Sequence, residues 1–235
     1  MISHKHKCIF IHIAKCAGST VENAFGVDIA DQSQNNHKNF FGWDDKNKLY
    51  LQHATPQELL SYGLIDENTW NNYYKFVIVR NSWDKSISDY FWMLRKEFLK
   101  GSFIKYLNRS GKFKKKLTDN SNSEYRGDHL TKQIDYFKLN GKFIKYDKVL
   151  FFDQLKTGLP EVAKDLSLPI DFFDKKINAN PEKKHYSKYY SYRMIKKVKK
   201  IYGQDIKFFG FKFDDKRSFK EKVLLFLKLK NPTNM

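Results

Sequence analysis

The chain has 235 residues, which is enough for one sizeable α/β domain. Its 44 Lys and Arg residues against 26 Asp and Glu residues give a formal net charge of +18, which indicates polyanionic partners: a nucleotide, a nucleic acid, an acidic glycan or an anionic membrane. Its 2 cysteines exclude a disulfide framework and fit a reducing compartment.

The first predicted element is a buried strand over residues 8–13, a run of apolar, β-branched and aromatic residues. A turn of small residues around Lys15 follows, and an apolar pattern at helical spacing begins at Val21. A strand that turns tightly into a helix leaves backbone N–H groups unpaired, small side chains let an anion approach them, and the lysine adds charge. We therefore predict a phosphate or sulfate site with five candidate contacts: Lys15, Ala17, Gly18, Ser19 and Thr20.

This segment is not a Walker A loop, because Lys15 precedes Gly18 instead of following the second glycine. Taken alone, an ordinary strand-to-helix turn with a solvated lysine explains the stretch equally well.

The next segments place a second candidate residue, His53, at the end of a predicted strand. Residues 27–48 are polar and predict a surface loop that borders the site. Residues 49–52 predict a short strand, parallel to the first and third strands, that ends at His53. Helices are expected after Thr55, which has the sequence of a capping box, and after Asp66.

A third strand is predicted over residues 76–79, and it ends at Arg80. A helix is expected from about residue 83 to residue 99, with Ser88 one to two turns inside it. A planar guanidinium can grip two oxygens of one anion, so Arg80 and Ser88 are candidates for a second phosphate contact. A structural salt bridge is the competing interpretation of Arg80.

Two stretches of this sequence resemble the nucleotide-binding signatures of the PAPS-dependent sulfotransferases of the carbohydrate type. The first is His-Ile-Ala-Lys-Cys-Ala-Gly-Ser-Thr over residues 12–20, and the second runs from Val79 to Tyr90. The resemblance covers most of residues 8–213 in the same order. Three positions depart from the family pattern: Ala14 and Ser82 replace prolines, and Cys16 replaces a threonine.

The resemblance implies an α/β fold, a P-loop-like parallel sheet flanked by helices, in a single domain over residues 1–213. It implies PAPS (3′-phosphoadenosine 5′-phosphosulfate) as co-substrate. Lys15 would contact the 5′-phosphate and the bridging oxygen. Arg80 and Ser88 would hold the 3′-phosphate, and a loop with Lys184 and Tyr186 would close over the nucleotide.

An acceptor hydroxyl needs a base, and His53 is our first candidate because the pKa of histidine lies near neutrality. Glu22 is the alternative base, and His12 is expected to be buried in its strand. The 7 histidines show no ligand spacing with carboxylates or cysteines, so no metal site is predicted.

The later segments are less informative. Residues 100–123 form a basic, loop-like stretch that fits either a substrate flap or a solvated insertion. Residues 129–133 resemble a segment that lies near the acceptor site in the family. Helices are expected over residues 155–166 and 192–202, and the basic tail, residues 214–235, is expected to form a packed helix.

The leading prediction is an enzyme that moves a sulfuryl group from PAPS to a hydroxyl of a carbohydrate acceptor, and an acidic glycan is one option. A kinase or other NTPase is the alternative enzyme, although the Walker A spacing is missing. A nucleic-acid-binding module fits the charge but lacks a recognition signature, so no specific nucleic acid is expected. The six-residue apolar run before the small-residue turn is too short for a signal peptide or a membrane span. We therefore expect a cytoplasmic protein, and peripheral membrane contact through the basic tail stays open.

Overall fold

The computed structural model describes residues 1–27, 40–174 and 184–223. The chain divides into two compact units, each built from two segments. Unit 1 comprises Met1–Arg80 and Asp119–Ala179, and unit 2 comprises Asn81–Thr118 and Asn180–Met235. The expectation of one domain over residues 1–213 stays a prediction.

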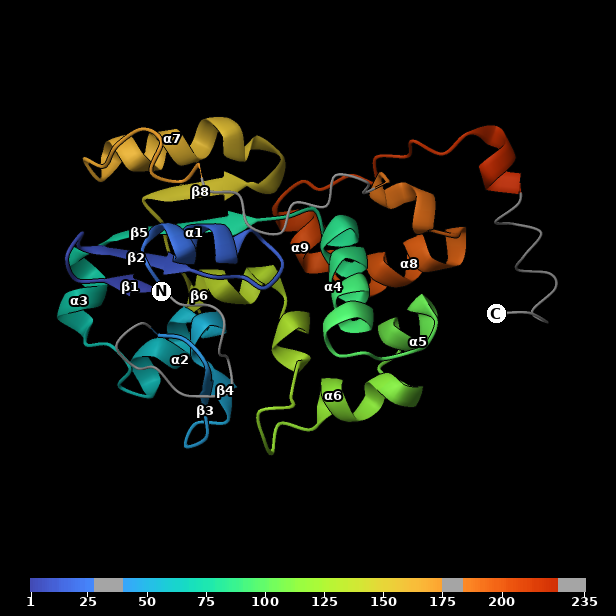
Figure 1. Ribbon diagram of the computed structural model, residues 1–235, viewed down its shortest axis with the longest axis horizontal. Coiled ribbons are helices and arrows are strands. Elements are labelled where there is room, and N and C mark those ends of the chain that lie inside the picture. The colour runs from blue at the N-terminus through green and yellow to red at the C-terminus, as the bar shows by residue number, and fades with distance from the viewer. Residues whose placement is uncertain (28–39, 175–183, 224–235) are drawn as a thin grey trace. The chain divides into compact units, whose positions relative to one another are not determined.

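Unit 1 contains a four-stranded sheet of order β1-β2-β5-β8, seen in Figure 1. β1 (Ile2–Ser3) is antiparallel to β2 (Cys8–Ile11), and β2, β5 (Tyr74–Val79) and β8 (Lys148–Phe151) are parallel. All four residues of β2 and the last four of β5 are buried, which explains why both strands are continuous apolar runs and do not alternate. The predicted α/β fold with a parallel-containing central sheet flanked by helices is confirmed.

Helices pack on this sheet. α1 (Gly18–Ala24) follows β2, and α7 (Leu155–Asp165) follows β8 and lies beside it in Figure 1. Gly158 permits the close approach of α7, because a Cβ there would lie 2.6 Å from a methyl carbon of Leu150. The loops after β2 and β5 leave the same sheet edge, because the two strands are parallel.

The prediction of a strand over residues 49–52 parallel to this sheet was wrong. β4 (Leu49–Tyr50) pairs antiparallel with β3 (Trp43–Asp44) in a separate two-stranded sheet, and the 3₁₀ helix η1 (Leu51–His53) follows. β4 contains only two residues, and so short a strand carries no sequence pattern that shows which strand it pairs with. The Trp43–Tyr50 ring contact, at 5.3 Å between centroids, stabilises the observed pairing.

The predicted helix starts in this region are confirmed. Thr55 and Glu58 form the capping box of α2 (Pro56–Ser61), and the Asp66 side chain caps α3 (Glu67–Asn72). The remaining elements of unit 1 are a hairpin and three 3₁₀ helices: β6 (Lys138–Leu139), β7 (Lys142–Phe143), η3 (Gly127–Leu130), η4 (Gln133–Phe137) and η5 (Phe152–Gln154).

Unit 2 is helical in its described part. Its longest helix, α4 (Ser82–Lys96), begins two residues after Arg80 and is capped by the Asn81 side chain. The other elements are α5 (Phe103–Leu107), η2 (Gly111–Phe113), α6 (Lys114–Thr118), η6 (Tyr186–Tyr189), α8 (Tyr192–Ile201) and α9 (Gly203–Phe208).

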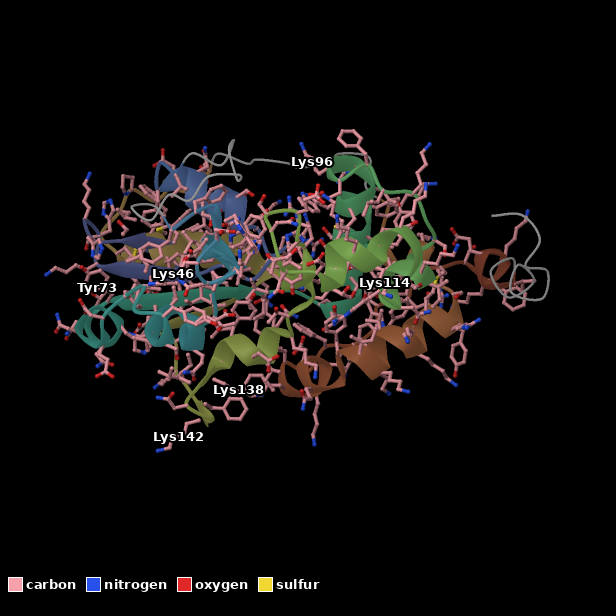
Figure 2. The ribbon with its side chains drawn as sticks, turned by 90° about the horizontal axis from the view of Figure 1, so that it is seen from below. Lys46, Tyr73, Lys96, Lys114, Lys138 and Lys142 are labelled. Carbon is pink, nitrogen blue, oxygen red and sulfur yellow. The ribbon has the colours of Figure 1, made fainter. Side chains whose placement is uncertain are left out.

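The basic stretch at residues 100–123 is more ordered than its sequence indicates. It contains α5, η2 and α6, and its aromatic residues Phe103, Tyr106 and Phe113 are buried. Tyr106 donates a hydrogen bond to Asp89 of α4 at 2.7 Å. The many lysines in this stretch made it look like a solvated loop, because they outnumber the buried aromatic residues. Lys114 is one of these lysines and is exposed (Figure 2).

The positive charge is concentrated in one unit. Among described residues, unit 2 has 23 Lys and Arg against 7 Asp and Glu, whereas unit 1 has 15 against 16. The outer side of α8 contributes four exposed cations: Arg193, Lys196, Lys199 and Lys200. Within the described part of the chain, the net positive charge therefore belongs to unit 2.

The basic tail is described only up to residue 223. Residues 219–223 are helical, as expected, but Phe219 is 83% exposed, which does not agree with the expectation of a packed helix. The rest of the tail lies outside the described residues. Within the described part of the chain, none of the helices combines the length and the apolar character that crossing a membrane requires.

Candidate active site

The loop after β2 has an unusual backbone. Lys15 and Ala17 adopt left-handed conformations, with φ of 69° and 62°, on either side of Cys16. Left-handed residues in a turn of this kind can direct backbone N–H groups toward one side, as in the concave nests that bind anions in other proteins. Ala17 is also the N-cap of α1, and no side chain caps this helix. The geometry therefore suits the phosphate contacts predicted for Lys15, Ala17, Gly18, Ser19 and Thr20.

The position of Gly18 requires a glycine, because the His12 side chain leaves no room for a Cβ there. A Cβ at this position would lie 1.8 Å from Nε2 of His12, so the imidazole of His12 packs directly against the backbone of the loop. Cys16 is fully buried, and its thiol points toward the Ala14 carbonyl and the Gln133 side chain. Cys16 therefore fills the interior at the position where the family pattern has a threonine.

Arg80 is tied to the same loop. Its Nη1 donates to the Lys15 carbonyl at 2.7 Å, and its guanidinium lies 3.9 Å from the centre of the Phe152 ring. Gln133, fully buried, accepts from the Arg80 N–H and donates to the Arg80 carbonyl, both at 2.8 Å. Arg80 is 5% exposed, so part of its role is to hold the loop.

His53 is paired with a carboxylate. Its Nδ1 lies 2.5 Å from Oδ2 of Asp128, and the Tyr136 hydroxyl donates to the His53 carbonyl at 3.1 Å. Burial lowers the pKa of His53 to about 4, against the opposing effect of Asp128. Burial pushes the pKa of Asp128 up, but the charges of the nearby histidines and the hydrogen bond from His53 lower it overall. At neutral pH the pair is a neutral imidazole that donates from Nδ1 to an ionised carboxylate, which leaves Nε2 as a proton acceptor.

The alternative base, Glu22, is already engaged. It is 1% exposed, and its Oε1 lies 2.9 Å from Nδ1 of His12. Burial pushes the pKa of Glu22 up, but the charge and hydrogen bond of His12 lower it overall. His12 is buried, as predicted, and its ring lies 4.7 Å from the ring of His53. Contacts therefore run from His53 through His12 to Gly18 in the loop of Lys15.

Three residues in this region have the composition of a metal site. Candidate ligand atoms of His53, Asp128 and His129 all lie within 4.8 Å of one another. Spacing in the sequence could not show this group, because His53 and Asp128 are 75 positions apart.

The other predicted contacts lie in unit 2. Ser88 is on α4 and half-buried, and Lys184 is exposed. Tyr186 is buried, and its hydroxyl accepts from the Asp214 backbone N–H at 2.7 Å. Tyr186 therefore has a structural partner, and the nucleotide contacts of all three residues stay predictions.

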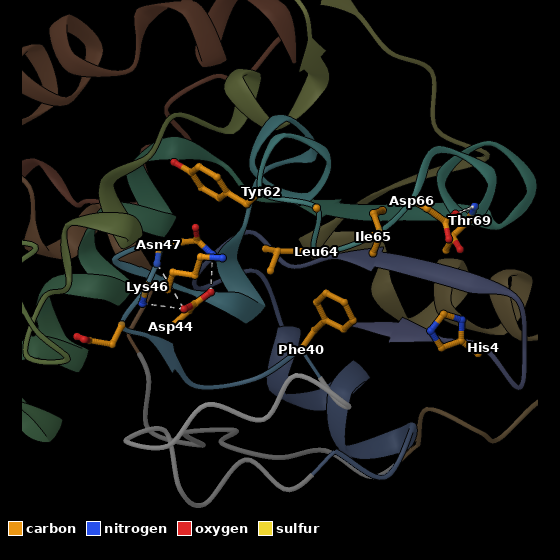
Figure 3. Close-up of a pocket in the computed structure, with 12 residues that line it drawn as sticks. His4, Phe40, Asp44, Lys46, Asn47, Tyr62, Leu64, Ile65, Asp66 and Thr69 are labelled. Carbon is orange, nitrogen blue, oxygen red and sulfur yellow. Dashed lines mark hydrogen bonds between the residues drawn. The ribbon is translucent and has the colours of Figure 1, made fainter.

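Sequence reasoning missed Asp128 and Gln133 as parts of the site. The only signal was the resemblance of residues 129–133 to a segment near the family's acceptor site. A pocket of about 760 Å³ in unit 1, shown in Figure 3, is lined by other residues, including His4, Phe40 and Asp66. None of the predicted site residues lines it.

Comparison with known families agrees with this geometry. Residues 1–212 match the family model described as the Sulfotransferase family, so the chain belongs to that family. Membership supports sulfuryl transfer as the general reaction. Neither the curated proteins nor the solved structures contain a significant match to the chain.

Proposed function

We propose that this protein transfers the sulfuryl group of PAPS to a hydroxyl of a carbohydrate acceptor, with His53 as the general base. The observation that carries this proposal is the His53–Asp128 pair, which lies one ring contact from His12 and thus next to the loop of Lys15. A base oriented beside an anion-binding loop is the arrangement that in-line transfer of a charged group needs.

In this mechanism the acceptor oxygen attacks the sulfur of PAPS. The bond between sulfur and the bridging oxygen breaks, and the leaving group is 3′-phosphoadenosine 5′-phosphate. The acceptor proton passes to Nε2 of His53, while Asp128 stabilises the resulting imidazolium through Nδ1. Lys15 neutralises the charge that builds on the bridging oxygen; at about 4 Å and an effective dielectric constant near 20, one such charge contributes roughly 4 kcal/mol.

The 3′-phosphate contact is assigned to Arg80 and Ser88. Arg80 follows β5 at the sheet edge from which the phosphate loop leaves β2, and it is bonded to that loop. Ser88 is proposed as a contact of the 3′-phosphate because it belongs to the second motif, Val79 to Tyr90. Lys184 and Tyr186 are proposed to close over the nucleotide on the same basis.

The test is a thermal-shift comparison of 3′-phosphoadenosine 5′-phosphate with ADP. A ligand that binds only the folded state raises its stability in proportion to the logarithm of its concentration over its dissociation constant. We expect a clearly larger shift with the 3′-phosphorylated nucleotide. Equal shifts, or a preference for ADP with magnesium, would contradict PAPS as the donor. Sulfuryl transfer to a panel of neutral and acidic sugars would then identify the acceptor.

A further inference from the structure

The group formed by His53, Asp128 and His129 has a second property beyond the orientation of a base. The side chains of His53 and Asp128 are 9% and 12% exposed, and His129 is 5% exposed. The rings of His53 and His129 are 5.1 Å apart and nearly perpendicular. Two imidazoles and a carboxylate thus share one enclosed volume.

These are the ligands that zinc-class ions prefer. Zn²⁺ binds histidine nitrogen at about 2.0–2.1 Å and carboxylate oxygen at about 2.0–2.2 Å, usually with tetrahedral geometry. Ligand atoms around one such ion are therefore about 3.4 Å from one another. The candidate atoms here lie within 4.8 Å, and the His53–Asp128 contact is 2.5 Å, so small side-chain rotations bring all three to that spacing.

One oxygen of the group has no hydrogen bond in the described structure. Oδ1 of Asp128 is buried and lacks a hydrogen-bond partner among the described residues. A buried carboxylate oxygen without a partner is costly, and a bound cation would satisfy it.

We propose that His53, Asp128 and His129 form a binding site for a zinc-class divalent ion, occupied in competition with the His53–Asp128 hydrogen bond. Three protein ligands leave a fourth position for water or an acceptor oxygen. The functional consequence rests on the proposed function: the ion inhibits transfer because it removes the base. Coordination through Nδ1 leaves the ring proton on Nε2, and coordination through Nε2 uses the accepting lone pair itself.

The binding test uses the full-length, untagged, chelator-treated protein and ZnCl₂ in isothermal titration calorimetry. We expect one ion per chain, with affinity reduced tenfold or more in His129→Gln and in Asp128→Asn. The matched control is His185→Gln, which removes a histidine 3.5 Å from a carboxylate, that of Asp214, in unit 2. This control should bind zinc like the unaltered protein.

Unaltered zinc affinity in both cluster variants would overturn the site, and so would an equal loss in the control. The melting temperature of each metal-free variant checks folding. If His129→Gln does not fold, Asp128→Asn, which keeps the size of the side chain, decides alone.

A second experiment separates the site from the proposed reaction. Zinc should inhibit sulfuryl transfer by the unaltered protein and a chelator should restore it, whereas the turnover of His129→Gln, compared with its own zinc-free rate, should resist inhibition. Zinc that binds the cluster without inhibiting would support the site and contradict His53 as the base. Calorimetry needs no turnover, so the site remains testable even if PAPS is not the donor.

Discussion

The two compact units differ in charge and in the way they hold their candidate residues. Among the residues that the structure describes, unit 1 has 15 cationic against 16 acidic residues, and unit 2 has 23 against 7. Yet Lys15, Arg80 and His53, the groups proposed for the chemistry, all belong to the nearly neutral unit 1. The proposed chemistry depends on these few groups, whereas most of the positive charge of the described residues is on partly or fully exposed side chains of unit 2. Net charge therefore reports on long-range attraction and not on the reaction.

The largest expected effect comes from His53 in unit 1. His53→Ala should lower turnover by roughly 10²–10⁴, the usual range for a general base, and should leave nucleotide affinity within about threefold. Steady-state turnover and calorimetry with 3′-phosphoadenosine 5′-phosphate measure the two quantities. Glu22→Gln is the control, and turnover that is lost there but survives in His53→Ala would identify Glu22 as the base.

Lys15→Ala should come next, with turnover lowered by about 10²-fold or more, since it removes one positive charge from the transition state. The protein should stay folded, because Lys15 is only partly buried and the Arg80 bond is made to its backbone carbonyl. Circular dichroism checks the fold. Near-normal turnover would show that the loop does not hold the reacting group.

Ser88→Ala tests whether unit 2 contributes to nucleotide recognition. Loss of a hydrogen bond to a charged phosphate costs about 1.5–3 kcal/mol, so nucleotides with a 3′-phosphate should bind about tenfold more weakly or worse. Nucleotides without it should bind as before. Arg80→Ala should weaken both kinds of nucleotide, because Arg80 also holds the Lys15 carbonyl. Equal weakening in Ser88→Ala would remove Ser88 from the 3′-phosphate site.

The pKa of His53 predicts a pH effect on the stability of the chelator-treated protein. Its value of about 4 in the folded state lies below the ordinary 6.5, so between these pH values the unfolded chain binds more protons. The contribution of His53 to stability should therefore fall as pH drops from 6.5 toward 4. Below pH 4 this contribution should change no further. Melting temperatures of the protein and of His53→Gln across this window measure the effect, and parallel curves would contradict it.

Turnover should also persist well below pH 6, whereas turnover that depended on a solvated histidine as base would be lost there.

The smallest effect should come from the outer side of α8. Lys199→Gln combined with Lys200→Gln removes two exposed charges, so the affinity for a polyanionic ligand should depend less steeply on salt. Turnover at saturating substrate should change by less than about twofold, because surface charges act mainly on encounter. A large loss of turnover would mean that unit 2 takes part in the chemistry.

Local features of the fold followed from the sequence alone. The buried strands β2 and β5 were visible as apolar runs, and the caps of α2 and α3 as Thr55 and Asp66. The tight turn from β2 into α1 was recognisable from its small residues around Lys15. These features depend on neighbouring residues, so burial and backbone conformation are encoded within a few positions of the chain.

Only the tertiary structure decided which distant residues meet. Asp128 reaches His53 across 75 positions, Gln133 links Arg80 to Cys16, and β4 pairs with β3 instead of joining the main sheet. The concentration of positive charge in unit 2 was equally hidden, because each unit combines two separate chain segments. Such pairings are selected by the burial and hydrogen bonding of the whole chain, and a linear pattern records only which side chains are present to be paired.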